Sequence, residues 1–328
     1  MKKRYQLVFL SLALLLLYFV LNKVGFNNII NTLKMLKWYY LVLAIALNLS
    51  MFLVWNKKWK SLVNKLGKIK FWELFPILMA GIFINTSTPT ANVGGEPLRA
   101  YYLGKKLRKE KTKCLATIII DKATNTATSL LFVVFSILFI TLFLKIPTTV
   151  KILTQSLIII AAIIIIVSIL LRKLKLEDTA RIFYPLFRKK FPDKKQFLTY
   201  IQNRIGSIKE VMKEFFKDNK AVKKEVTLAL VMQLLTFAKA YVLFIALGQN
   251  VNPLNVVIAV SISMVVGQLI LVPGGVGVIE SSMISMYALM GINANIAATV
   301  AILDRIIYYF FALGVGYLSF SYLNYKHR

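Results

Sequence analysis

The chain has 328 residues, of which 58% are hydrophobic and 17% are charged, and this composition excludes an ordinary soluble domain. A net charge of +29 would suggest nucleic acid in a soluble protein, but cytoplasmic loops of membrane proteins collect Lys and Arg, so we expect no nucleic-acid partner. The single cysteine, Cys114, and the single histidine, His327, exclude an internal disulfide and a Cys/His metal site. We expect no cofactor.

Continuous apolar runs along the chain approach or exceed the roughly 20 residues that a helix needs to cross a hydrocarbon core of about 30 Å. These runs are Leu7–Leu21, Trp38–Trp55, Cys114–Leu144, Ile152–Leu171, Val226–Leu247 and Ile296–Tyr322. The first run follows basic residues as a signal peptide would, but it lacks a small-residue cleavage pattern and is expected to remain as an anchor. Two further stretches, Phe71–Pro97 and Pro253–Met290, are apolar but interrupted by Pro, Gly and polar residues.

Basic residues gather in particular connections and predict the sidedness of the chain. One loop holds Lys57, Lys58, Lys60, Lys65, Lys68 and Lys70, and the next holds Arg99, Lys105, Lys106, Arg108, Lys109, Lys111 and Lys113. Both loops are expected in the cytoplasm, as is the basic segment 172–224, whose alternating apolar and basic residues suit amphipathic helices on an anionic inner-leaflet surface. The same count places both termini in the cytoplasm and the connection 248–252 outside.

The two interrupted stretches are predicted to be broken elements of opposite orientation. A single pass through Phe71–Pro97 would put two basic loops on opposite sides, so this stretch is expected to enter and leave on the same side. Pro253–Met290 must begin and end outside, either as a second hairpin or as two spans. The prediction is an all-α polytopic integral membrane bundle, a single domain over residues 1–328, with six spans and two re-entrant hairpins or eight spans and one. Paired broken elements suggest an inverted repeat and are typical of transporters.

Both broken elements carry the same kind of motif, a proline followed by a Gly-Gly pair and a glutamate. The first contains Gly94, Gly95 and Glu96, and the second contains Gly274, Gly275 and Glu280. Glycine pairs let backbone N–H groups face a ligand, and a helix that starts just after them favours phosphate or carboxylate. The alternative is that the glycines only permit tight turns and close helix packing.

Several further ionisable residues lie in apolar surroundings. Besides the two glutamates, they are Arg99, Asp121, Lys122, Lys239, Asp304 and Arg305. Charges at bilayer depth are costly, so they face the protein interior and often mark a pathway. Arg305 is expected to stack with Tyr309, four residues along its helix. Four acids and four bases also permit complete mutual pairing, which would make them a structural network that holds helices in register.

The glycine motifs and the closing Arg305 in an aromatic helix resemble the lysylphosphatidylglycerol synthase transmembrane-region family, also described as flippase-like or UPF0104 membrane proteins. In its best-known bacterial members this region is joined to an aminoacyl transferase and is held to move the aminoacylated lipid between leaflets. Some archaeal relatives fuse it to a glycosyltransferase that acts on a polyprenyl phosphate. This chain lacks the transferase, so the resemblance implies translocation rather than aminoacylation.

Three functions remain open from the sequence. The leading one is a cell-membrane flippase that holds a phospholipid or polyprenyl-linked headgroup through the ten residues Gly94, Gly95, Glu96, Arg99, Asp121, Lys122, Gly274, Gly275, Glu280 and Arg305. A lipid-phosphate transferase is the second, although no nucleophile-base motif, phosphate loop or metal cluster supports catalysis. The third is a non-transporting subunit that anchors a separate synthase or glycosyltransferase.

Overall fold

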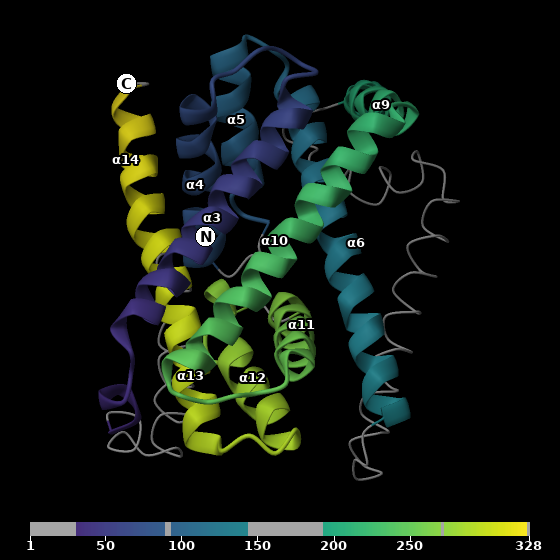
Figure 1. Cartoon of the computed structure of the whole chain (residues 1–328). Coiled ribbons are helices and arrows are strands. Elements are labelled where there is room, and N and C mark those ends of the chain that lie inside the picture. The colour runs from purple at the N-terminus through teal and green to yellow at the C-terminus, as the bar shows by residue number, and fades with distance from the viewer. Residues whose placement is uncertain (1–30, 89–92, 144–192, 270–271, 327–328) are drawn as a thin grey trace.

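The structure, a computed structural model, describes residues 31–88, 93–143, 193–269 and 272–326 (Figure 1). Every regular element in that part is a helix, which confirms the predicted all-α class. Four helical segments in it are long and apolar enough to cross a membrane: α3 (Trp38–Val63), α6 (Lys111–Phe143), α10 (Asn219–Ala246) and Ala294–Lys326. The predicted spans Leu7–Leu21 and Ile152–Leu171 lie outside the described residues. The chain is a polytopic helical membrane bundle.

The last span is built from three consecutive pieces. They are α13 (Ala294–Tyr309), the π-helix η2 (Phe310–Val315) and α14 (Gly316–Lys326). A π-helical turn inside an α-helix marks a local adjustment of packing, often beside a functional residue. Here α14 lies so close to α4 that a Cβ at Gly316 would be 2.8 Å from the Cβ of Phe83.

The first interrupted stretch forms a hairpin of α4 (Phe71–Ser87) and α5 (Glu96–Leu107). At about 1.5 Å per residue neither arm spans a bilayer core. Lys106, near the end of α5, is 2.8 Å from Glu73, near the start of α4, so both arms open at the same end of the bundle. The predicted loop from Arg99 to Lys113 is wrong over residues 99–107, because these form the returning arm.

The second interrupted stretch is also a hairpin, which decides against two spans. It consists of α11 (Pro253–Leu269), the 3-10 turn η1 (Pro273–Gly275) and α12 (Val278–Leu289). Ile258 and Ile262 of α11 pack with Met286 and Met290, so the two arms meet at their outer ends. In Figure 1 this hairpin enters from one end of the bundle and the α4–α5 hairpin from the other.

The basic connections gather at one end, which we call the basic end and define by Lys65, Lys106 and Lys113. Helix α9 (Lys194–Lys217) lies there across the direction of α10, and α14 ends on the same side (Figure 1). The apolar side of α9 is buried through Phe197, Val211 and Phe215, so this helix is amphipathic, as the sequence predicted. At the opposite end the N–H of Lys37 bonds the carbonyl of Ala246, 2.9 Å away.

Candidate functional site

The inner ends of the two hairpins touch in the middle of the bundle. A Cβ at Gly274 would be 3.1 Å from Cγ2 of Thr86, at the end of α4. The Tyr309 hydroxyl donates to the carbonyl oxygen of Gly274 at 3.1 Å, which fixes the second hairpin to α13. Gly274 has a φ of +61°, a conformation that side chains with a Cβ rarely adopt, so the contact depends on glycine.

A cavity of about 240 Å³ lies beside this contact and is bordered by both hairpins and by α3, α6, α10 and α13. The charged residues that line it are Glu96, Arg99, Asp121, Lys122 and Arg305. Three cations therefore face two carboxylates, and amide and hydroxyl side chains such as Gln233 and Ser129 supply further hydrogen-bonding groups. The sequence prediction placed all five charged residues in one site, and the structure brings them together.

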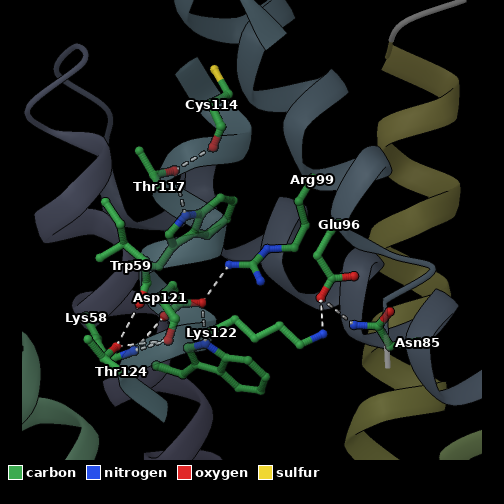
Figure 2. Close-up of polar contacts among 12 residues, drawn as sticks. Lys58, Trp59, Asn85, Glu96, Arg99, Cys114, Thr117, Asp121, Lys122 and Thr124 are labelled. Carbon is green, nitrogen blue, oxygen red and sulfur yellow. Dashed lines mark hydrogen bonds and ion pairs between the residues drawn. The ribbon is translucent and has the colours of Figure 1, made fainter. Parts of the chain in front are cut away.

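The first group of buried charges, the Asp121 cluster, consists of Lys58, Arg99, Asp121 and Glu225. Figure 2 shows Lys58 and Arg99 directed at Asp121. The Lys58 Nζ lies 2.8 Å from Oδ1 of Asp121 and 3.2 Å from Oε1 of Glu225. Arg99 Nη2 lies 3.1 Å from Oδ2 of Asp121. The cluster joins α3, α5, α6 and α10 and balances two positive charges with two negative ones.

Two tryptophans of α3 complete the surroundings of the Asp121 cluster. Trp55 Nε1 donates to Oδ2 of Asp121 at 3.0 Å, and Trp59 Nε1 donates to Oγ1 of Thr117 at 3.2 Å. The guanidinium of Arg99 lies 3.9 Å from the centre of the Trp59 ring, within the range of a cation–π contact. The aromatic groups shield the cluster from water and fix the orientation of Arg99.

The Lys122–Glu96 pair is a separate, more open part of the cavity wall. Lys122 Nζ is 2.9 Å from Oε1 of Glu96, and the Lys122 side chain is 39% exposed (Figure 2). Asn85 also contacts Glu96, because Nδ2 of Asn85 donates to Oε1 of Glu96 at 3.4 Å. Oδ1 of Asn85 accepts a hydrogen bond from the Gly95 N–H at 2.6 Å. A charge that is partly exposed in a cavity can exchange its partner for a ligand at a lower desolvation cost than a fully buried one.

The second buried group, the Asp304 cluster, consists of Lys239, Asp304 and Arg305. Lys239 Nζ lies 2.9 Å from Oδ1 of Asp304 in an ion pair, and Arg305 Nε donates to Oδ2 of Asp304 at 2.9 Å. The Arg305 guanidinium lies 5.2 Å from the centre of the Tyr308 ring, so the predicted stacking on Tyr309 is wrong. The reason is that the hydroxyl of Tyr309 turns to the carbonyl of Gly274.

The glycine pairs have packing roles in this structure. A Cβ at Gly95 would be 2.0 Å from the carbonyl oxygen of Gly81, so the α4–α5 crossing requires glycine there. The N–H of Gly95 bonds Asn85, and the N–H of Gly275 bonds Val272 at 3.0 Å. Gly94, Gly95, Gly275 and Glu280 lie beside the cavity rather than among its lining residues. Binding of a ligand by these backbone amides stays a prediction.

Sequence reasoning missed two members of the Asp121 cluster. Lys57, Lys58 and Lys60 were assigned to a basic loop, and this assignment is wrong: all three lie in α3, and Lys58 is fully buried there. Glu225 sits next to the basic run of Lys223 and Lys224, which hid it in the same way. The available signal was helical spacing, since Trp55, Lys58, Trp59 and Leu62 share one face of α3.

This combination of spans, opposed broken-helix hairpins and a charged internal cavity defines a polytopic helical membrane protein. The chain matches the lysylphosphatidylglycerol synthase TM region family over residues 6–316 and belongs to that family. It is 26% identical over 322 residues to a UPF0104 membrane protein of Methanocaldococcus jannaschii, covering 95% of this chain and 93% of that one. A UPF0104 membrane protein of Pyrococcus horikoshii is 23% identical over 313 residues, covering 93% and 92%.

Proposed function

We propose that this protein moves a lipid with an anionic phosphate headgroup, a phospholipid or a polyprenyl-linked lipid, between the leaflets of the cell membrane. The observation that carries the proposal is the contact of the two opposed hairpins at Thr86 and Gly274, beside a cavity that presents Arg99, Lys122 and Arg305. Each hairpin opens toward a different end of the bundle, so a headgroup held between them is close to both sides.

Arg305 is the residue best placed to grip the phosphate. Its Nε and Nη2 donate hydrogen bonds to Asp304. Within the described part of the chain, the one hydrogen-bond contact of Nη1 is with the sulfur of Met264, 4.0 Å away. A guanidinium stays charged when desolvated and offers a planar set of donors that suits phosphate. The proposal includes two further points. The protein carries the lipid without changing it chemically, and the basic end lies in the cytoplasm against the anionic inner leaflet.

The test uses purified protein in liposomes that contain fluorescent phosphatidylglycerol, with dithionite quenching to count the label in each leaflet. Arg305→Ala is expected to keep its fold, because Asp304 remains paired with Lys239, and to lose nearly all transport. Arg305→Lys should retain part of it. Lys106→Met removes a cation from a partly exposed surface pair and serves as the matched control with unchanged transport.

Other outcomes would decide for the competing functions. Chemical conversion of the labelled lipid, seen by chromatography of the extracted liposomes, would indicate a membrane-embedded transferase. A well-folded wild-type protein that neither moves nor converts phosphatidylglycerol or a labelled polyprenyl phosphate would contradict the proposal and favour a subunit that anchors a separate synthase or glycosyltransferase.

A further inference from the structure

Asp304 pairs with both Lys239 and Arg305, and these two cations lie at different distances from the cavity. Arg305 lines the cavity, whereas Asp304 and Lys239 lie behind it and are almost completely buried. Besides Oδ1 of Asp304, the Lys239 Nζ approaches Oδ1 of Asn48 and the backbone carbonyl of Asp304, each at 3.3 Å. Lys239 Nζ therefore lies among oxygen atoms of α3 and α13. Asp304 stands between it and Arg305, which lines the cavity.

The Asp304 cluster has a surplus positive charge. It contains two cations and one carboxylate, and a desolvated net charge is costly unless it is balanced. The nearest further acid is Glu280 of α12, but it forms no ion pair within 4 Å in the described part of the chain, and its buried Oε2 has no hydrogen-bond partner there. Tyr287 contributes a neutral hydroxyl, α3 contributes Asn48, and α11 and residues 123–143 of α6 contain no ionisable side chain.

The two cations respond differently to this surplus. Arginine keeps its proton even when it is desolvated, whereas a buried lysine gives its proton up readily. A surplus charge is therefore relieved either by loss of the proton from Lys239 or by binding of an anion at Arg305. Because both changes act on the same carboxylate, binding of the anion and binding of the proton favour each other.

Building on the function proposed above, we propose that Lys239 carries a proton that moves together with the anionic headgroup. When the headgroup phosphate binds Arg305, a hydronium ion transfers its proton to the electron pair of the neutral Lys239 amine and becomes water. On the other side of the membrane the phosphate leaves Arg305 and the proton returns from Lys239 to water. Once protonated, Lys239 is paired with Oδ1 of Asp304, which lies 2.9 Å from its Nζ. One proton and one monoanion cross together, so the exchange is electrically neutral and is driven by a pH gradient.

The experiment imposes a pH gradient on liposomes that contain the protein and fluorescent phosphatidylglycerol. Without a gradient, wild-type protein and Lys239→Arg should both equilibrate the lipid between leaflets. With a gradient, wild type should concentrate the lipid in the leaflet on the alkaline side, up to about tenfold per pH unit, because one pH unit is worth about 1.4 kcal/mol per proton. Lys239→Arg and Lys239→Gln should ignore the gradient, whereas the surface control Lys106→Met should still respond.

The gradient-free arm tests the proposed function and the gradient arm tests the proton, so the two can fail separately. Wild-type protein that equilibrates the lipid but ignores the gradient would overturn the inference, and so would a retained response in Lys239→Gln. A second measurement does not depend on transport or on the variants folding equally well. Short-chain phosphatidylglycerol added to weakly buffered wild-type protein in detergent should cause uptake of up to one proton, and binding without uptake would also overturn the inference.

Discussion

Lys58 of α3 and Asp121 of α6 are 63 residues apart in the sequence, yet the ammonium donates to Oδ1 of Asp121 at 2.8 Å in a site closed to water. The ammonium also donates to the backbone carbonyl of Asp121 at 2.8 Å. Removing one partner from such a pair leaves an uncompensated buried charge. The two spans are therefore connected by a contact that tolerates little change.

Lys58→Met should destabilise the protein by about 3 to 5 kcal/mol, because Glu225 loses its cation and Asp121 keeps only Arg99. The double variant Lys58→Met with Glu225→Gln should recover much of the loss. Thermal unfolding in detergent measures both. Lys65→Met removes an exposed ion pair with Asp218 and should cost no more than about 1 kcal/mol. Equal effects of the two single substitutions would contradict the role of Lys58.

The hairpin geometry predicts which loops share a side of the membrane. In a Cys114→Ala background, cysteines placed singly at positions 65 and 106 should both be protected from an impermeant thiol reagent added outside intact cells. A cysteine at Asn250, in the connection at the opposite end, should react. Cys114 itself is buried and should contribute little background. Reaction at only one of positions 65 and 106 would break the proposed topology.

Gly95→Ala should reduce the yield of folded protein, because the new Cβ would overlap the carbonyl of Gly81 and force the α4–α5 crossing apart. Gly206→Ala in α9 is the matched control, since nothing lies within 4 Å of its Cβ position. That change should be neutral or stabilise α9 by up to about 1 kcal/mol through its better helix propensity. Fluorescence-detected size exclusion compares the two, and a normal yield for Gly95→Ala would show that the crossing can relax.

The contact between Lys65 and Asp218 at the basic end should make stability depend on pH. The hydrogen bond from Lys65, and then the bond from the Ala221 N–H, hold the pKa of Asp218 below its ordinary value of 3.8. A lowered pKa stabilises the folded state above pH 3.8, and the stabilisation disappears as the pH falls through the folded-state pKa. The difference in melting temperature between wild type and Asp218→Asn should be largest near neutral pH and shrink toward pH 3. A constant difference would mean that the charge of Asp218 is unimportant.

The amino-acid sequence by itself determined the class of the fold and predicted the first hairpin. Hydrophobic length marks spans such as Trp38–Trp55 because lipid forces the backbone to satisfy its own hydrogen bonds. The parity of the basic loops indicated that Phe71–Pro97 turns back, but it left Pro253–Met290 open between a hairpin and two spans. These are local or additive properties, and each can be read from one stretch of the chain.

Only the tertiary structure decided which charges pair. Helical spacing places Lys58 on the same face of α3 as Trp55 and Trp59, but its burial and its partners depend on Asp121 and Glu225 in distant helices. The contact of Gly274 with Thr86 and the sharing of Asp304 by Lys239 and Arg305 likewise require helices to be placed against one another. Ion pairs act over a few ångströms across elements whose separation along the chain carries no information, so the cavity and its charge balance emerge only from the packed bundle.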